Sequence, residues 1–256
     1  MQISSSLKQF GSNEDPVWQA RVDLAASFRW FARLDMHEGV ANHLSVAVSP
    51  DGGQFLMNRA GRHFSKVRAS DLLLLDAHGD REAMGPDAPD PTAWHIHARL
   101  HALLPQARCV MHLHSKYATA LSALADSTLY PIDQNTMRFF GRVALDDAFP
   151  GMALNDDEGD RLASRLTDGK SVLMMGNHGV LVTGPTVARA FDELFYFERA
   201  CETLITCYMT GKPIRIVSDE IAALTERQWA EYQGLAEAHL REVKAILDVE
   251  EPDYRT

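Results

Sequence analysis

Apolar residues recur along the chain with the two periods that are typical of helices and of strands. Asp15-Pro16 supplies an N-cap and a proline at the first helical position, and apolar residues follow at helical spacing through Phe31. A strand over residues 44–48 then meets turn residues 50–53 and a second apolar run over 55–57, which is typical of a β-hairpin. The chain is therefore predicted to begin with an amphipathic helix and a hairpin.

The middle of the chain continues this alternation. Residues 72–76 form an apolar run that returns after His78-Gly79-Asp80, so a second hairpin is predicted. Asp90-Pro91 again pairs an N-cap with a proline and predicts a helix that ends at Pro105.

The C-terminal half is predicted to be mostly helical around two buried strands. Residues 155–158 place an asparagine N-cap before three acidic residues of a first helical turn. Apolar runs over 171–175 and 180–182 predict the two strands. A long helix follows and stops at Gly211-Lys212-Pro213, after which residues 222–247 again have a helical pattern.

Length and composition indicate a globular protein. With 256 residues, 46% of them hydrophobic, the chain buries a substantial core, so we predict one domain over residues 1–256. Its core is expected over about residues 17–210, with a helical tail over 214–256. The net charge of −10 argues against nucleic acid or an anionic membrane as a partner. Without a membrane-length apolar run or a signal-peptide apolar segment, the protein is expected to be cytoplasmic.

Two histidines lie two residues apart in the apolar segment 110–114. Because strand side chains alternate, His112 and His114 point to one face, while Met111 and Leu113 point to the other. A His-x-His pair on a strand presents two nitrogen ligands to a transition metal. The alternative is a pair of half-buried histidines that are hydrogen-bonded to their neighbours.

A third candidate imidazole lies some sixty residues downstream. His178 occupies the turn Gly176-Asn177-His178-Gly179 between the two predicted strands. Glycines in such a turn allow the backbone to approach another group closely. The three cysteines, Cys109, Cys201 and Cys207, form no Cys-x-x-Cys pair and are expected to be reduced and not to bind metal.

Two further groups of residues, a pair of histidines and a basic cluster, each allow either a functional or a purely structural interpretation. His97 and His101 share a helix face, either as a second metal pair or as buried hydrogen-bonded histidines. His37 and His43 are six residues apart with Gly39 between them, so a zincin motif is rejected. A basic cluster is either an anion-binding lip or a set of solvated loop charges. Its members are Arg59, Arg62, His63, Lys66 and Arg68.

Three of these segments together resemble the class II aldolase/adducin head-domain family. They are residues 38–45, 110–114 and 177–179, and the resemblance extends over roughly residues 17–208. It implies an α/β fold with three layers, α/β/α, around a central, largely antiparallel sheet. It also implies one divalent metal on His112, His114 and His178, and a homotetramer with its site near a subunit interface.

The chain departs from the sugar-phosphate aldolases of that family at three places. Where those aldolases carry a glutamate that acts as acid and base, this chain has Ala93 beside Trp94. Their Thr-Gly phosphate loop corresponds here to Ala60-Gly61, and a tyrosine proton donor falls near Gln134. These differences disfavour an ordinary sugar-phosphate aldolase.

We therefore expect a metal-dependent carbon–carbon lyase that acts on a small anionic oxo- or hydroxy-acid through a metal-stabilised enolate. A decarboxylase is favoured, because loss of CO₂ needs an electron sink but no base that removes a carbon-bound proton. An aldolase or epimerase is the alternative, and a non-catalytic adducin-like interaction module is a second alternative. Zn²⁺ is the expected metal, with Mn²⁺, Co²⁺ or Fe²⁺ possible. Candidate catalytic residues are Glu38, His43 and His97; candidate substrate-binding residues are Asn42, Arg59, Gly61, Arg62 and Gln134.

Overall fold

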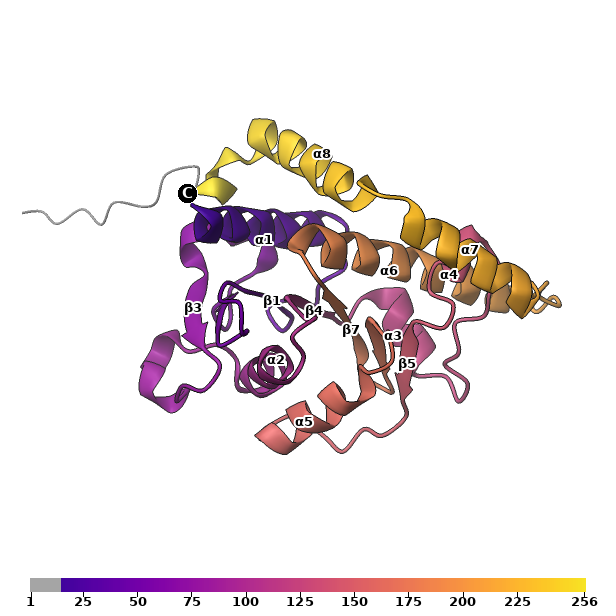
Figure 1. Cartoon of the computed structure of the whole chain (residues 1–256), viewed down its shortest axis with the longest axis horizontal. Helices are drawn as coiled ribbons and strands as arrows, with labels where there is room; N and C mark the ends of the chain where they lie inside the picture. Colours follow the sequence, from indigo (N-terminus) through magenta and orange to yellow (C-terminus); the bar gives the residue numbers. More distant parts are fainter. Residues whose placement is uncertain (1–14) are drawn as a thin grey trace, which may run out of the picture.

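A mixed sheet forms the centre of the protein, whose computed structural model describes residues 15–256. Within that range all neighbouring strands are antiparallel except β5 and β6, which are parallel. Helices cover both faces of the sheet (Figure 1), which confirms a three-layer α/β/α fold around a largely antiparallel sheet. In spatial order the seven strands are β3 (Leu73–Asp76), β2 (Gln54–Met57), β1 (His43–Ala47), β4 (Cys109–Leu113), β7 (Gly179–Gly184), β6 (Val172–Met175) and β5 (Val143–Asp146).

One face of the sheet packs against α1 (Pro16–Arg33) and α6 (Val187–Met209). Met111 and Leu113 of β4 belong to this core, as strand alternation predicts. The helix α8 (Leu235–Glu250) lies across α1 and α6 as a further layer, shown in yellow in Figure 1. The remaining helices near this side are α3 (Lys116–Ser122), α4 (Gln134–Met137) and α7 (Asp219–Glu231).

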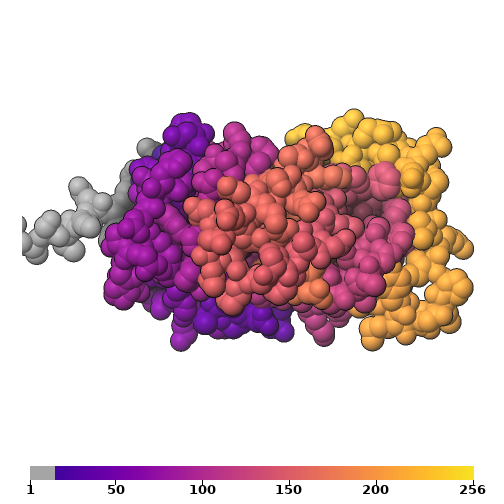
Figure 2. Space-filling model, turned by 90° about the horizontal axis from the view of Figure 1, so that it is seen from below, coloured from indigo at the N-terminus to yellow at the C-terminus, as the bar shows by residue number. Residues whose placement is uncertain are grey.

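The opposite face packs against α2 (Pro91–Leu103) and α5 (Asp156–Arg165), and Val110 points into this second core. Figure 2 shows this side, where the segment around residues 145–165 lies at the centre of the surface. Asp90 and Asn155 cap the two helices through their side-chain oxygens, which confirms both predicted N-caps.

The C-terminal segment is helical, as its pattern predicts, and it is tied to the first helix by charge. Arg29 of α1 is buried and forms ion pairs with Glu251 at 3.0 Å and Asp253 at 2.9 Å. Within residues 15–256, no helix is long and apolar enough to cross a membrane. Four short 3₁₀ helices complete the described elements: η1 (Phe64–Lys66), η2 (Ala69–Asp71), η3 (Glu82–Asp87) and η4 (Pro252–Arg255).

The second predicted hairpin is wrong. The apolar run is β3, but it pairs only with β2 and forms the edge of the sheet, and no strand returns after Gly79. Instead, Asp80 accepts a hydrogen bond from the backbone nitrogen of Glu82 at 3.0 Å, which starts the turn that leads into η3. The residues after Gly79 lack an alternating apolar run, so they have no face to bury in a further strand.

Candidate metal centre

The three candidate histidines converge at one end of the central strands. His112 lies near the end of β4, and His114 follows directly after this strand. His178 lies in the turn between β6 and β7, and β7 pairs with β4. The sheet register therefore brings three imidazoles together, with potential ligand atoms that all lie within 4.8 Å of one another.

Hydrogen bonds fix which nitrogen of His112 and His114 faces the site. Nδ1 of His112 donates to the carbonyl oxygen of Val180 at 3.0 Å, and Nδ1 of His114 donates to a carboxylate oxygen of Glu38 at 2.6 Å. A carbonyl or a carboxylate can only accept, so each Nδ1 carries its proton. Nε2 of each ring is consequently the nitrogen that is left to bind a metal.

The turn that holds His178 depends on close backbone packing. Asn177 adopts a left-handed conformation with φ of 55°, a region that asparagine tolerates better than most residues. A Cβ atom at Gly179 would lie 2.7 Å from the carbonyl oxygen of Leu113 and 3.1 Å from the ring of His114. Glycine at this position therefore lets the turn approach the two ligands on β4.

The electrostatics of the site favour neutral imidazoles. Burial lowers the pKa of His178 to about 4, and burial together with neighbouring histidines lowers the pKa of His112 well below its usual value. Neutral imidazole is the form that binds a metal.

The three side chains fit a divalent cation. Nε2 of His112 and Nε2 of His114 lie 3.0 Å apart. Neither Nε2 carries a proton, because the proton of each ring is on Nδ1 and is donated to Val180 or to Glu38. Two lone pairs at this distance repel unless a positive charge lies between them. Tetrahedral zinc with bonds of about 2.0–2.1 Å would hold its ligand nitrogens slightly farther apart than this.

A cavity of about 280 Å³ opens beside the imidazoles. Its polar wall contains the three candidate ligands, His43 and Asp90. Its other lining residues are Ala41, Thr92, Ile96, Phe149, Met152 and Ala153, so no lysine or arginine of the described chain lines it.

Sequence reasoning identified Asp90 only as a helix cap. One carboxylate oxygen, Oδ1, accepts hydrogen bonds from the backbone nitrogens of Thr92 and Ala93. Oδ1 also accepts from the hydroxyl of Thr92, and the same residue forms part of the cavity wall, so Asp90 contributes both to the helix cap and to the site. The capping pattern hides this second role. Phe149 also lies close to the site, with its ring centre 5.9 Å from that of His178. It was not predicted from the sequence, because its segment has no regular period of apolar residues.

Two of the candidate residues support the site from outside the cavity. Glu38 does not line the cavity, because it lies on the Nδ1 side of His114 and orients that ring. The Asn42 side chain is buried and its Oδ1 accepts from the backbone nitrogen of Glu38 at 2.7 Å. This geometry gives Glu38 a positioning role and does not support its predicted role as a proton donor.

The predicted anion-binding residues lie elsewhere in this chain. Arg59 forms an ion pair with Asp87, and Arg62 forms one with Asp71 at 3.1 Å. Gly61 is exposed in the turn before η1, with φ of 69°. These three residues do not line the cavity, so the structure does not bring the basic cluster to the imidazoles.

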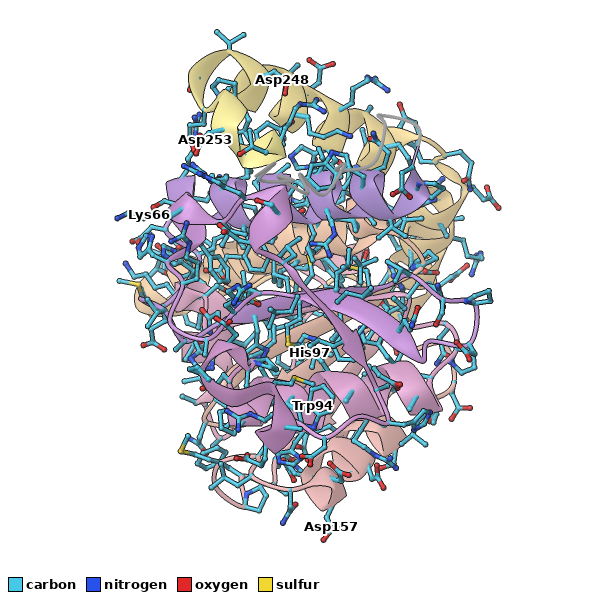
Figure 3. All side chains as sticks on the ribbon, turned by 90° about the vertical axis from the view of Figure 1, so that its left-hand side faces the viewer. Lys66, Trp94, His97, Asp157, Asp248 and Asp253 are labelled. Atoms are coloured by element: carbon cyan, nitrogen blue, oxygen red, sulfur yellow. The ribbon has the colours of Figure 1, made fainter. Side chains whose placement is uncertain are left out.

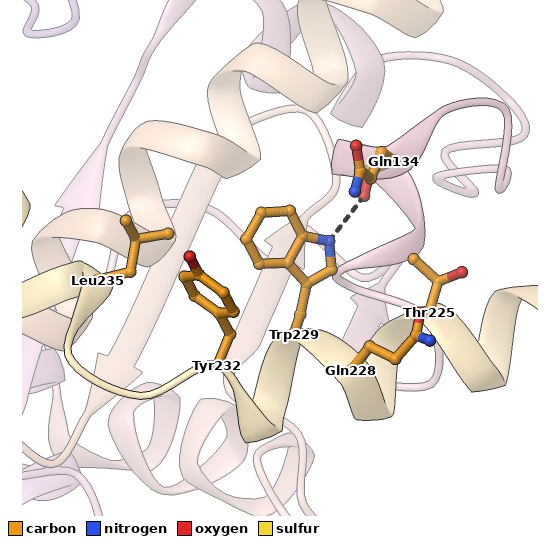
Figure 4. A pocket seen from close by; sticks show the side chains of 6 residues that line it. All are labelled: Gln134, Thr225, Gln228, Trp229, Tyr232 and Leu235. Atoms are coloured by element: carbon orange, nitrogen blue, oxygen red, sulfur yellow. Dashed lines mark hydrogen bonds between the residues drawn. The ribbon is translucent and has the colours of Figure 1, made fainter.

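Gln134 also lies away from the imidazoles. It lines a second cavity, of about 370 Å³, at the surface between α4 and α7. Figure 4 shows the indole nitrogen of Trp229 donating to the backbone oxygen of Gln134, at 3.1 Å, with Tyr232 beside it. Within one chain, this residue does not contact the candidate metal site.

His97 and His101 are not a second metal pair. Both rings are buried, and the hydroxyl of Ser45 lies between them, 2.6 Å from His97 and 2.7 Å from His101. In Figure 3 His97 lies near the middle of the view and Lys66 at its edge. The hydrogen-bonded alternative is correct for this pair, and His97 does not line the cavity.

Comparison with known proteins agrees with this architecture. A family model described as the class II aldolase and adducin N-terminal domain matches residues 22–205. The chain belongs to the class II aldolase/adducin family. This confirms the resemblance inferred from the three sequence segments.

Individual members of the family are similar over most of the chain. A putative aldolase class 2 protein of Caulobacter vibrioides is 33% identical over 212 residues, 83% of this chain and 81% of that protein. Decarboxylase NovR of Streptomyces niveus is 32% identical over 224 residues, 84% and 82% of the two chains. An aldolase II superfamily protein from Pseudomonas syringae has a solved structure with 31% identity and a TM-score of 0.84, covering 95% of this chain and 98% of that one.

Ala93 stands where the resemblance to the family's sugar-phosphate aldolases implies a glutamate. Ala93 is buried on α2, in a core with Trp94 and Phe55. The nearest acidic residue along the chain is Asp90, three positions earlier, and it does line the cavity. The cavity wall therefore includes a carboxylate residue at the start of α2.

Proposed function

We propose that this chain is a metal-dependent carbon–carbon lyase, favoured as a decarboxylase of an oxo- or hydroxy-acid. The observation that carries the proposal is the convergence of three imidazoles on one cavity that also contains a carboxylate. His112, His114 and His178 would hold one divalent ion, with Zn²⁺ expected first and Mn²⁺, Co²⁺ or Fe²⁺ as alternatives. When bound, the ion supplies Lewis acidity, which draws electron density from a substrate oxygen.

Decarboxylation suits a cavity that lacks the family glutamate. In an acid with a carbonyl group β to its carboxylate, the bond to the carboxylate carbon breaks and its electron pair moves toward the carbonyl oxygen. CO₂ leaves, and the remaining carbon takes up one proton. The chain then needs to supply a proton but no base for a carbon-bound hydrogen. We assign delivery of this proton from water to Asp90, since it lines the cavity.

The cavity wall favours an apolar substrate group over a sugar phosphate. Ile96, Phe149 and Met152 provide apolar surface, whereas Arg59 and Arg62 are engaged with carboxylates outside the cavity. Phosphate groups are usually held by arginine, lysine or a helix N-terminus. The similarity to a protein that is named as a decarboxylase supports the same choice.

Release of CO₂ tests the proposal. Zinc-loaded protein is mixed with carboxyl-¹³C-labelled 3-oxo acids that carry an alkyl or aryl group, and labelled CO₂ is measured by mass spectrometry against the spontaneous rate. We expect release above background that disappears after chelation of the metal. Cleavage of a sugar phosphate into two carbonyl fragments, without CO₂, would instead support the aldolase. A fully metal-loaded protein that turns over neither class would support the adducin-like module.

The assigned role of Asp90 has a conservative test. Asparagine is as good an N-cap as aspartate, so Asp90→Asn keeps α2 capped while it removes the acid. We expect kcat to fall about 10²- to 10⁴-fold, the usual contribution of a positioned acid, with metal content unchanged. Asp156→Asn, on the exposed first turn of α5, is the matched control. An unchanged kcat in Asp90→Asn would remove Asp90 from the reaction.

A further inference from the structure

A row of buried hydrogen bonds connects the cavity with the interior between β1 and α2. Nδ1 of His43 lies 2.8 Å from Nε2 of His97, and Nδ1 of His97 lies 2.6 Å from the hydroxyl of Ser45. The same hydroxyl lies 2.7 Å from Nε2 of His101, whose Nδ1 lies 2.9 Å from the carbonyl oxygen of Ala107. The three histidines and the serine are all buried.

The buried end of this row sets the direction of its hydrogen bonds. The carbonyl of Ala107 can only accept, so Nδ1 of His101 carries a proton. Burial lowers the pKa of His101 to about 4, so the ring is neutral and its Nε2 is an acceptor. The Ser45 hydroxyl therefore donates to His101. Because a hydroxyl has one proton, its oxygen must accept from Nδ1 of His97.

The same reasoning continues to the cavity. Burial lowers the pKa of His97 well below its usual value, so its Nε2 is an acceptor and Nδ1 of His43 donates to it. The His43 ring is buried, and its one hydrogen-bond partner in the described chain is the neutral ring of His97 rather than a carboxylate, so His43 is neutral as well. Nε2 of His43 is then left without a proton, and no group among residues 15–256 donates a hydrogen bond to it. Since His43 lines the cavity and its Nδ1 is engaged, Nε2 is the nitrogen available there.

We propose that Nε2 of His43 is a fixed hydrogen-bond acceptor for a hydroxyl group of the substrate. Ser45, His97 and His101 are positioning residues, because they hold His43 in one tautomer without reaching the cavity themselves. The inference rests on the proposed lyase function and narrows its substrate class to acids with a hydroxyl group beside the reacting centre. It also replaces the proton-donor role that the sequence suggested for His43 and His97.

The position of His43 beside His112 explains why such a hydroxyl would lie close to the three candidate metal ligands. His43 and His112 are direct partners in the pairing of β1 with β4, and their ring centres are 4.8 Å apart. A substrate oxygen held by the three-histidine site would thus place an adjacent hydroxyl near His43. An ether or a hydrogen at that position cannot donate, so the buried acceptor would lose its partner.

Neutron diffraction from the metal-loaded wild-type protein tests the direction of the row. We expect deuterium on Nδ1 of His43, His97 and His101 and none on Nε2 of His43. Deuterium on Nε2 of His43 would overturn the proposal, because this nitrogen would then be a donor. The measurement needs no substrate, so it stands apart from the CO₂ assay of the proposed function.

A pair of unreactive acids tests the consequence for binding. Glycolate carries a donor hydroxyl beside its carboxylate, and methoxyacetate carries an ether there. We expect zinc-loaded wild type to bind glycolate about tenfold more tightly by calorimetry, the value of one hydrogen bond at about 1.4 kcal/mol. In Ser45→Ala, Nδ1 of His97 loses the oxygen that accepts its hydrogen bond, so the tautomers of His97 and His43 are no longer fixed. The preference for glycolate over methoxyacetate should then vanish.

Ser27→Ala is the matched control, because Ser27 is also buried but hydrogen-bonds to the carbonyl of Asp23 on α1. It should keep the wild-type preference for glycolate. Zinc content, measured in all three proteins, should be equal. Equal binding of the two acids by wild type, or a preference that persists in Ser45→Ala, would overturn the proposal even if CO₂ release has been demonstrated.

Discussion

At the scale of single residues, Glu38 determines which nitrogen of His114 faces the cavity. Its carboxylate accepts a hydrogen bond from Nδ1–H of His114, which leaves Nε2 to bind a metal. Glu38→Gln removes the negative charge and weakens this hydrogen bond. We expect zinc affinity to fall about 10- to 100-fold, as is usual when such a supporting group is changed. Competition with a chromogenic chelator measures the affinity.

The matched control for Glu38→Gln is Glu231→Gln, an exposed glutamate at the end of α7. It should leave zinc affinity within twofold of wild type. If Glu38→Gln binds zinc as tightly as this control, the carboxylate does not orient His114.

The proposed ligands are predictable from the sequence because each follows a local rule. Strand alternation places His112 and His114 on one face, and glycines mark the turn of His178. The row from His43 to His101 is not predictable in this way. It depends on Ser45 lying between two rings of another element, and this contact exists only after β1 and α2 have packed together.

At the scale of elements, the packing of β1 against α2 makes stability depend on pH. His43, His97 and His101 are buried there as neutral rings, and the pKa of His101 is lowered from 6.5 to about 4. The unfolded chain therefore binds protons before the folded chain does as pH falls. This contribution is complete above pH 6.5 and is lost as pH decreases toward the folded pKa.

In metal-free protein, we expect the free energy of unfolding to drop by about 1.5 to 2 kcal/mol between pH 6.5 and 5 on account of His101, since one pKa unit corresponds to about 1.4 kcal/mol. Urea denaturation at several pH values measures the slope. His101→Gln should reduce this slope by the equivalent of one proton. A wild-type stability that is constant over this range would show that these rings do not stay neutral.

Most elements are predictable from the chain because caps and periodicity agree at their ends. Asp15-Pro16 and Asp90-Pro91 each start a helix where the sequence indicates. The prediction of a second hairpin was wrong because the sequence around it does not determine which strand is the partner. The run over β3 indicates a strand, but its partner is the preceding β2, and strand pairing depends on the whole sheet rather than on the next residues.

At the scale of the whole molecule, we predict a homotetramer. The expectation follows from the family, and the surface supports an association: Met152 and Leu154, near the cavity, are 72% and 62% exposed. Light scattering at micromolar concentration should give four times the chain mass of 28.5 kDa. A monomer mass would leave each chain to supply every group of its own site.

The central claim is that His112, His114 and His178 hold one divalent ion, and elemental analysis of protein purified without a histidine tag tests it most directly. We expect one ion per chain in wild type and in the control His95→Ala, whose ring lies outside the cavity. In His178→Ala the affinity for the metal should fall at least 10- to 100-fold. This is the loss that usually follows a change in a group that only supports a ligand, and His178 is a proposed ligand itself. Full metal retention in His178→Ala would contradict the account.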